Sequence, residues 1–422
     1  MSDARQNTID ASLRARAEKV LPGGVYGHMN MKKLPSGYPQ FMASGKDGRL
    51  TDVDGNEYID YMCGWGPIVL GRQCETVDQA AQAAFARGDI FNGPGAEMVE
   101  LAELLCETIP HADWAIFGKN GTDATTASVT TARAATHRNT ILVAESSYHG
   151  AIPWCTPSMS GVTAEDRANQ VRFVYNDIES LRAAVAQAGD DFAAIIIAPV
   201  HQPLGAQQQY ATTEFAHAAR QLCDQHGALL ILDEVRVGFR IDLKGAWDQF
   251  GVQPDLSAWS KAIANGYPLS AVTGIERLRE AVTSIYVTGS FWYSASSMAA
   301  AIATIKELRD TDALARIEVA GTMLCDGLRA QAEKHGFDAE VSGPVQMPLM
   351  LFGDTEGAEL GKRFSQHCID NGVYLHPTHN WFISAAHSEQ DIRETLEVTD
   401  AAFASLSAAP DAGREAEALA VA

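Results

Sequence analysis

The sequence lacks any long apolar run. No stretch of about 18 or more apolar residues occurs, so no segment is a candidate for crossing a membrane. The N-terminal residues 1–20 are polar and lack the apolar core of a secretory signal. We therefore expect a soluble, cytoplasmic protein.

Cysteines and basic residues are also few. The seven cysteines are scattered, and none forms a Cys-x-x-Cys pair, so we expect reduced, mostly buried thiols and no metal site. The chain has 32 Lys and Arg against 53 Asp and Glu, a formal net charge of −21. A protein this acidic is not expected to bind nucleic acid or an anionic membrane.

Two common nucleotide-binding motifs are absent as well. The chain contains neither the Walker loop G-x-x-x-x-G-K-[ST] nor the dinucleotide fingerprint G-x-G-x-x-G. The second absence disfavours a nicotinamide-dependent dehydrogenase of the Rossmann type.

What the chain does contain is the pattern of an α/β protein. With 422 residues, 46% of them apolar, it is long enough for a large domain and a smaller one. From about residue 70, short strands rich in Ile, Val and Leu alternate with helices, which predicts a mainly parallel sheet covered on both faces. The expected strands are 112–118, 140–146, 171–176, 192–199, 228–235 and 255–260.

The domain boundaries follow from changes in this pattern. Residues 1–70 hold a helix over 8–20 and two strands around Asp54-Gly55, and we expect them to join the smaller domain. Residues 71–310 would form the large domain and 311–406 the rest of a small α+β domain. The Ala-rich residues 407–422 are expected to be a flexible tail.

Polar residues follow two of the expected strands at their carboxyl ends. Asn120, Gly121 and Thr122 stand at a predicted helix N-terminus, where backbone N–H groups and a hydroxyl would suit a phosphate, although an ordinary helix cap explains them too. Tyr148 and His149 follow the next strand, and a tyrosine there either stacks on a planar ligand or is an ordinary loop aromatic.

Charged residues follow two further strands. Asp233 ends the apolar run "LLIL", and a buried carboxylate needs a cationic or proton-donating partner. Lys261 has largely apolar neighbours, which would lower its pKa and make the amine nucleophilic, although a surface lysine at a helix start is the alternative. A phosphate cradle, a stacking ring, a carboxylate and a desolvated lysine together are what pyridoxal 5′-phosphate (PLP) requires.

Longer motifs carry a family resemblance over residues 12–400. They are "LPGGV", "DVDGNEYIDYMCGWGPIVLG", "NGTDAT", "SYHG", "LDEVRVGFR", "SKAIANGYP" and "TGSFWYSASSMAAA". On these motifs the chain resembles the fold-type I PLP enzymes of the class III aminotransferase family, in the branch that contains glutamate-1-semialdehyde aminomutase. The resemblance implies a large, mainly parallel sheet domain, a smaller α+β domain, and a homodimer with its active sites at the subunit interface.

The resemblance also implies roles for single residues. Lys261 would form the Schiff base, Asp233 would bind the ring nitrogen, and Ser290 would reach the phosphate of the neighbouring subunit. Val235 would lie under the ring. The full set of expected cofactor-binding residues is Asn120, Gly121, Thr122, Tyr148, His149, Asp233, Val235, Lys261 and Ser290.

Several residues differ from those of glutamate-1-semialdehyde aminomutase at positions that would contact the substrate. Asn30 stands where that enzyme has the arginine that holds the substrate carboxylate, and Phe291, Trp292 and Tyr293 replace small residues. These changes favour a bulky or apolar amine without an α-carboxylate, although the rings would equally suit the dimer interface. The candidate substrate residues are Tyr26, His28, Asn30, Trp65, Arg236, Trp292 and Trp381.

Arg236 is a further departure, because relatives often have Met or Gln directly after Asp-Glu-Val. The resemblance places this position near the cofactor's phenolic oxygen. Arg236 would serve that oxygen or the carboxylate of a keto-acid acceptor, or it would pair with Glu234 or another acid outside the pocket. With "YGH" and "TGSFW", it makes the chain similar to a subgroup of amine transaminases that includes the aminopolyol transaminase acting on hydrolysed fumonisin.

The predicted reaction is ping-pong transfer of an amino group from a primary amine to a keto acid such as pyruvate. Lys261 would act as general base, and Asp233 would support negative charge through the ring nitrogen. The alternatives are an aminomutase of the glutamate-1-semialdehyde type, a β-amino-acid aminotransferase, a decarboxylase or racemase of the same fold, and a cofactor-binding regulator without activity.

Overall fold

The structure is a computed structural model, and it describes residues 5–30, 34–35, 37–203, 205–353 and 358–408. The chain divides into two compact units. Unit 1 comprises Met1–Met62 and Glu318–Ala422, and unit 2 comprises Cys63–Ile317. Of the tail expected over 407–422, residues 409–422 lie outside the described residues. None of the helices in the described ranges is both long and apolar enough to span a membrane.

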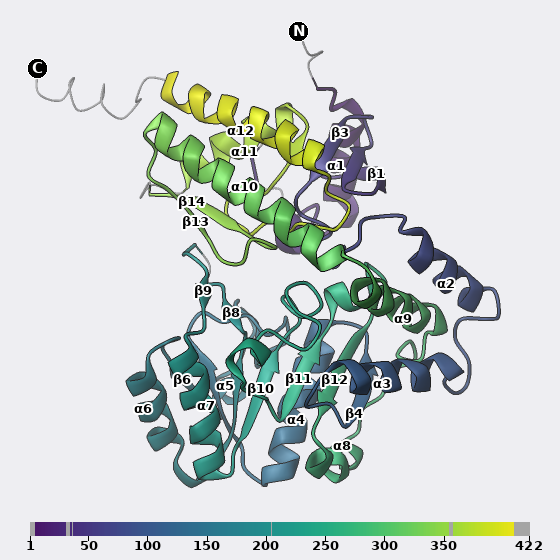
Figure 1. The fold of residues 1–422 in the computed structure, drawn as a ribbon, viewed down its shortest axis with the longest axis vertical. Helices are drawn as coiled ribbons and strands as arrows, with labels where there is room; N and C mark the ends of the chain where they lie inside the picture. Colours follow the sequence, from purple (N-terminus) through teal and green to yellow (C-terminus); the bar gives the residue numbers. More distant parts are fainter. Residues whose placement is uncertain (1–4, 31–33, 36, 204, 354–357, 409–422) are drawn as a thin grey trace, which may run out of the picture. The chain divides into compact units, whose positions relative to one another are not determined.

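Unit 2 is built around a sheet with the strand order β4-β12-β11-β10-β7-β5-β6 (Figure 1). Its strands are β4 (Trp114–Gly118), β5 (Thr140–Ala144), β6 (Gln170–Phe173), β7 (Phe192–Ile197), β10 (Leu229–Asp233), β11 (Leu256–Trp259) and β12 (Ser270–Gly274). Strands β6, β5, β7, β10 and β11 pair in parallel, whereas β12 runs antiparallel to both β11 and β4. The predicted mainly parallel sheet is confirmed, and β12 is an additional strand that was not expected.

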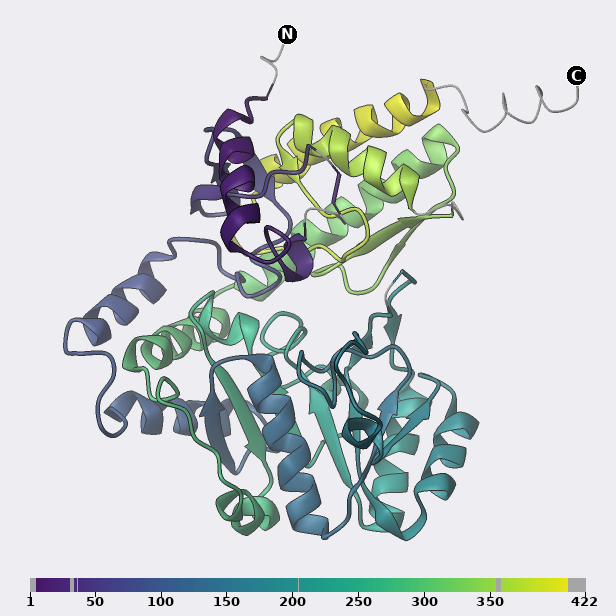
Figure 2. The same ribbon diagram turned by 180° about the vertical axis from the view of Figure 1, so that it is seen from behind.

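Helices cover both faces of this sheet because successive side chains of a strand point to opposite faces. Leu230 and Leu232 of β10 belong to the core shared with α6 (Ile178–Ala188) and α7 (Thr213–His226). Leu229 and Ile231 belong to the core shared with α4 (Gly121–Thr136). Helices α6 and α7 lie in front of the sheet in Figure 1, and the opposite view brings α4 forward (Figure 2).

The strand directions bring several strand ends to one edge of the sheet. Because β4 and β11 are both antiparallel to β12, β4 runs in the same direction as β11 and the strands parallel to it. The carboxyl ends of β4, β5, β7, β10 and β11 therefore meet at the same edge, where α/β sheets bind their ligands.

Shorter elements complete unit 2. They are α2 (Glu75–Phe85), α3 (Ala96–Thr108), α5 (Ala164–Arg167), α8 (Arg279–Ser284), α9 (Ala295–Asp310), the strand pair β8 (Val200–His201) and β9 (Gln209–Tyr210), and the 3₁₀ helices η3 (Gly189–Asp191), η4 (Asp248–Phe250), η5 (Lys261–Ala264) and η6 (Glu276–Leu278). Helix α9 packs against α2 and α3.

Unit 1 contains a second sheet of order β1-β2-β3-β15 and a separate hairpin. The turn predicted at Asp54-Gly55 joins β2 to β3, and Gly55 has a positive φ of 87° that favours glycine. The elements are α1 (Thr8–Val20), η1 (Gly27–Met29), β1 (Met42–Lys46), β2 (Arg49–Asp52), β3 (Glu57–Asp60), β13 (Ala339–Ser342), β14 (Leu349–Phe352), α11 (Glu359–Asp370), β15 (Val373–Tyr374) and α12 (Glu389–Ala408). Helix α10 (Ala313–His335) begins in unit 2 and continues into unit 1 at Glu318.

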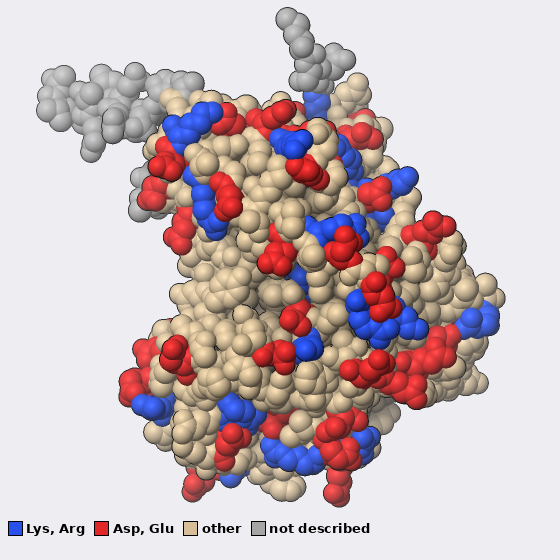
Figure 3. Space-filling view, in the orientation of Figure 1, with Lys and Arg blue, Asp and Glu red and all other residues tan. Residues whose placement is uncertain are grey.

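Acidic and basic side chains are interspersed over the face drawn in Figure 3. A denser acidic group lies over α3, where Glu100, Glu103 and Glu107 are exposed.

Candidate active site

Helix α4 starts at the carboxyl edge of the sheet, directly after β4. Asn120 is its N-cap, and the Asn120 side chain accepts a hydrogen bond from the Asp123 backbone N–H at 3.3 Å. The Asp123 carboxylate in turn accepts from the Asn120 N–H at 3.0 Å, which completes a capping box. The N–H groups of this first turn and the positive end of the helix dipole suit an anion such as a phosphate.

Two glycines let the backbone come close to the start of α4. A Cβ on Gly121 would lie 2.6 Å from Cγ1 of Val235, so a side chain there would push the helix away from this wall. A Cβ on Gly150 would lie 2.7 Å from Oγ1 of Thr122, and Gly150 has a φ of 142°. Both positions therefore require glycine, and the cradle at the helix start is formed by closely packed backbone.

A hydrogen-bonded pair lies at the end of β10. His149 Nδ1 and Asp233 Oδ2 are 2.7 Å apart, and both side chains are buried. The other oxygen, Asp233 Oδ1, accepts from the Val235 N–H at 3.1 Å. Thr125 Oγ1 donates to the His149 carbonyl at 2.6 Å, which fixes the backbone of His149 against α4. Within the described residues, His149 Nε2 is buried and makes no hydrogen bond.

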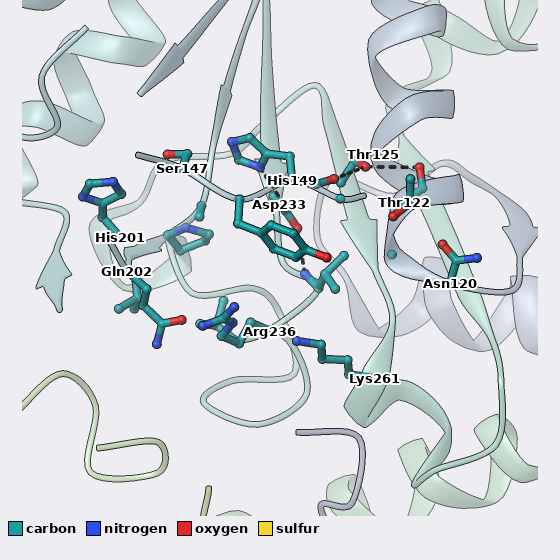
Figure 4. Close-up of a pocket in the computed structure, with 18 residues that line it drawn as sticks. Asn120, Thr122, Thr125, Ser147, His149, His201, Gln202, Asp233, Arg236 and Lys261 are labelled. Atoms are coloured by element: carbon teal, nitrogen blue, oxygen red, sulfur yellow. Dashed lines mark hydrogen bonds and ion pairs between the residues drawn. The ribbon is translucent and has the colours of Figure 1, made fainter. Parts of the chain in front are cut away.

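Lys261 follows β11 and enters the pocket from the turn η5. Its φ of 52° is a left-handed value that a lysine seldom adopts, and it directs the side chain away from the path of the strand. The amine points into the pocket (Figure 4). Desolvation by burial, followed by the positive charge of Arg236, lowers the pKa of Lys261 to about 7.

Arg236 and Gln202 lie on the side of the pocket away from Asn120 and Thr122 (Figure 4). Desolvation lowers the pKa of Arg236 to about 10, so the guanidinium keeps its charge at neutral pH. Gln202 follows β8, and its Nε2 donates to Gln208 Oε1.

Most of the predicted cofactor residues line this one pocket. They are Asn120, Gly121, Thr122, Tyr148, His149, Asp233, Val235 and Lys261, together with Arg236 from the substrate set. Tyr148 is 40% exposed, which leaves its ring open toward a ligand. The lining thus joins the ends of β4, β5, β10 and β11.

Of the remaining predicted residues, those in unit 2 (Ser290, Trp292 and Trp65) are not among the described residues that line the pocket. Ser290 lies in unit 2 between α8 and α9, and nearby Trp292 lines a small separate cavity with Phe117. Trp65 also belongs to unit 2 and has a left-handed φ of 69°. The other candidates, Tyr26, His28, Asn30 and Trp381, belong to unit 1, and their substrate role stays a prediction.

The pocket also contains residues that were not predicted. Thr125, Ser147, His201 and Gln202 line it beside the expected ones. Ser147 directly precedes Tyr148, and Thr125 lies one helical turn after Gly121, so both could have been found by extending the predicted segments. His201 and Gln202 follow the apolar strand 192–199, whose carboxyl end the same rule would have flagged.

Comparison with known proteins identifies the family. The model of the family "Aminotransferase class-III" matches residues 35–402. The chain is a class III aminotransferase. The aminotransferase is 45% identical over 399 residues to the aminopentol aminotransferase of Sphingopyxis macrogoltabida, with 94% of each chain covered. It is 35% identical over 422 residues to the glutamate-1-semialdehyde 2,1-aminomutase of Dechloromonas aromatica (strain RCB), with 93% and 97% covered.

A solved structure agrees with this assignment. The aminotransferase matches a PLP form of the FumI protein of Sphingopyxis sp. MTA144 with a TM-score of 0.93 and 45% identity, over 94% of this chain and 96% of that one. The predicted fold-type I architecture and the predicted PLP cofactor are therefore confirmed.

The pocket of the aminotransferase fits this cofactor. A helix start with glycine at the closest contact suits the phosphate, and the Asp233 carboxylate suits a protonated ring nitrogen. Lys261 presents an amine whose lowered pKa leaves much of it unprotonated near neutral pH. These three features lie around one cavity, which is the arrangement that PLP chemistry needs.

Proposed function

We propose that the aminotransferase works in the cytoplasm and moves an amino group from a bulky primary amine, without an α-carboxylate, to a keto acid such as pyruvate. The observation that carries this proposal is the convergence of three groups on one pocket. They are the start of α4, the His149–Asp233 pair and the Lys261 amine.

The residues of the pocket would hold and polarise the cofactor. Bound PLP supplies an electron-withdrawing ring that stabilises negative charge on the substrate carbon. The first-turn N–H groups of α4 and the Thr122 hydroxyl would hold the phosphate. Asp233, oriented by His149 and by the Val235 N–H, would keep a proton on the ring nitrogen. Tyr148 and Val235 would contact the two faces of the ring.

Lys261 would perform two steps. Its amine, which a pKa of about 7 leaves largely unprotonated at neutral pH, would hold the aldehyde group of the cofactor. Once the amine substrate is bound, Lys261 Nζ would take the proton from the substrate carbon that bears the nitrogen and would act as general acid when that proton is returned. The same residue works in reverse when the keto acid receives the amino group.

Two observations support an amine donor of this class. Asn30 offers an amide where an arginine would clamp a substrate carboxylate. The relative named aminopentol aminotransferase is 45% identical to this chain over 399 residues, and its name describes an amine that carries hydroxyl groups.

We also propose that the aminotransferase is a homodimer with its sites at the subunit interface. Large apolar side chains are exposed on and around α2 and α3, among them Phe85, Phe91 and Val99. Phe291 is 66% exposed beside Ser290, the residue expected to reach the partner's phosphate. Exposed apolar side chains of this size support an interface with a second copy. Sedimentation analysis that finds only monomers in the cofactor-loaded protein would refute the dimer.

Spectroscopy and a substrate panel test the proposed function. The purified protein loaded with PLP should show a visible absorption band that survives dialysis and is lost in Lys261→Ala. Pyruvate should then accept amino groups from a panel of bulky primary amines, and α- and β-amino acids serve as comparison donors. Activity restricted to carboxylate-bearing donors would contradict the proposed role of Asn30. A product isomeric with its substrate, formed without pyruvate, would indicate an aminomutase.

A further inference from the structure

We propose that Asn265 is a positioning residue for Lys261. It holds the turn η5 against residues 63–71 (the anchoring segment), and this contact keeps the backbone of Lys261 in the conformation that turns its amine into the pocket. The proposal rests on the proposed function, because it takes Lys261 as the residue that holds the cofactor.

The turn η5 has a left-handed residue at each end. Lys261 opens the turn with a φ of 52°, and Asn265 follows it with a φ of 43°. Asparagine visits this conformation more readily than most residues, whereas it is unfavourable for lysine. A residue keeps such a conformation only where the surrounding structure holds it. Because a 3₁₀ helix of four residues makes few hydrogen bonds of its own, the support of Lys261 comes from contacts outside the turn.

The Asn265 side chain supplies such a contact. Its Oδ1 accepts hydrogen bonds from the N–H groups of Val69 at 3.0 Å and Leu70 at 2.9 Å, and its Nδ2 donates to the Gly71 carbonyl at 2.9 Å. Two N–H donors and one carbonyl acceptor fix which way the amide points. Asn265 is 6% exposed, so losing these partners would leave buried polar groups unsatisfied. The end of η5 is therefore tied to the anchoring segment, 194 to 196 residues earlier in the chain.

The anchoring segment is itself held by the turn after β10. Arg240 is fully buried, and its Nη2 donates to the carbonyls of Gly66 at 2.7 Å and Ile68 at 3.0 Å. A Cβ on Gly266, next to Asn265, would lie 2.7 Å from Cδ1 of Ile68, so the end of η5 packs closely on the segment. The segment thus connects η5 to the turn after β10, and η5 cannot shift without breaking these contacts.

An ordinary role for Asn265 would be to end the turn η5. A left-handed asparagine is common directly after a helix, and that role depends on the backbone conformation alone. Glycine adopts the same conformation without a side chain. Replacing Asn265 with glycine therefore separates the end of the turn from the hydrogen bonds to the anchoring segment.

The experiment compares the full-length protein with three variants. Asn265→Gly keeps the left-handed turn and removes the three hydrogen bonds, whereas Asn265→Asp keeps the accepting oxygens and loses the donor. Asn176→Gly is the matched control, because Asn176 is also left-handed, with a φ of 62°, and its side chain also binds distant backbone, at the Tyr210 carbonyl and the Thr212 N–H. Each variant is made in the parent protein and in a Lys261→Ala background.

Three measurements follow the proposed effect. They are the rate at which PLP added to the cofactor-free protein produces the visible band, the kcat for an amine of the substrate panel, and the dissociation constant of PLP in the Lys261→Ala background. A displaced amine slows the steps that depend on its position, so Asn265→Gly should lower the rate of band formation and kcat by about tenfold to a hundredfold. Asn265→Asp should lose less, and Asn176→Gly should resemble the parent protein.

The Lys261→Ala background distinguishes positioning of the lysine from general damage to the pocket. A residue that acts through Lys261 has no effect once Lys261 is removed, so Asn265→Gly should change the dissociation constant of PLP in this background by less than about twofold. Clearly weaker PLP binding in this background would overturn the proposal, and so would a parent-like rate of band formation in Asn265→Gly.

Two further measurements on the cofactor-free proteins check the contact and the fold. Hydrogen exchange at the Val69 and Leu70 amides should become faster in Asn265→Gly, and unchanged exchange would overturn the proposal. Thermal melting shows whether each variant has folded, and if Asn265→Gly has not, Asn265→Asp gives the same comparison. A visible band that survives Lys261→Ala contradicts the proposed function itself, so the two failures are distinguishable.

Discussion

The buried amine of Lys261 should lower the free energy of unfolding of the cofactor-free protein, and the size of this decrease should depend on pH. The amine is buried in a pocket that also holds Arg236, and both effects lower its pKa to about 7 from an ordinary value of 10.5. Lys261→Met removes this desolvated amine and keeps the length of the side chain. We therefore expect the variant to be more stable than the parent protein near neutral and acidic pH.

The size of the effect follows from the shift of the pKa. Each unit corresponds to about 1.4 kcal/mol, so the whole shift sets an upper bound of about 5 kcal/mol. Because the side chain is partly exposed to the pocket, solvent screening reduces this figure to roughly 2 kcal/mol. Between pH 7 and 10.5 the unfolded chain binds the proton and the folded chain does not, so the stability of the parent protein rises with pH across this window.

Urea unfolding of the cofactor-free proteins measures the difference. Lys261→Met should exceed the parent protein by roughly 2 kcal/mol at pH 6, and the two should converge as the pH approaches 10. Lys306→Met, which changes an exposed lysine of α9, should show no such convergence. A gain for Lys261→Met that is the same at every pH would refute the reasoning, because it would arise from packing rather than from charge.

Three further predictions concern the same pocket. His149→Phe removes the hydrogen bond to Asp233 and should weaken PLP binding by about tenfold to a hundredfold in equilibrium titrations. His149→Asn keeps an N–H donor and should lose less affinity. Equal affinities of the parent protein and both variants for PLP would contradict the orienting role of His149. Gly121→Ala places a methyl group 2.6 Å from Val235 and should lower the free energy of unfolding by about 1–3 kcal/mol. The double variant with Val235→Ala should recover part of this stability. A lack of recovery would mean that the contact with Val235 does not cause the loss of stability. Glu234→Gln should become more stable relative to the parent protein as the pH rises from 4.5 to about 8. Burial raises the pKa of this carboxyl, so its ionisation in the unfolded chain opposes folding of the parent protein over this range. A relative gain in stability as the pH falls would refute this reasoning.

The sequence predicted the parts of the pocket that depend on single strands. Apolar runs that end in Asp233 or are followed by Asn120 and Lys261 indicate strand ends, and strands of one direction must share an edge. The start of α4 also depends on neighbouring residues alone, because Asn120 is a favourable N-cap and Asp123 completes the capping box.

Contacts that depend on distant segments could not be predicted in this way. Strand β12 contains serine, threonine and glycine, and it is buried because β4 and β11 flank it rather than because it is strongly apolar. The bond between His149 and Asp233 joins positions 84 residues apart. The side of the pocket on which Arg236 lies depends on the turn after β10, and the sequence left its partner open.

The lining residues of the pocket all lie between Asn120 and Lys261. Nothing before or after this interval contributes a side chain to the described lining. Synthesis of the chain through residue 261 therefore already provides every lining side chain that the structure describes in this pocket. Likewise, recombination between relatives that exchanges the flanking segments would leave this described set of lining residues unchanged.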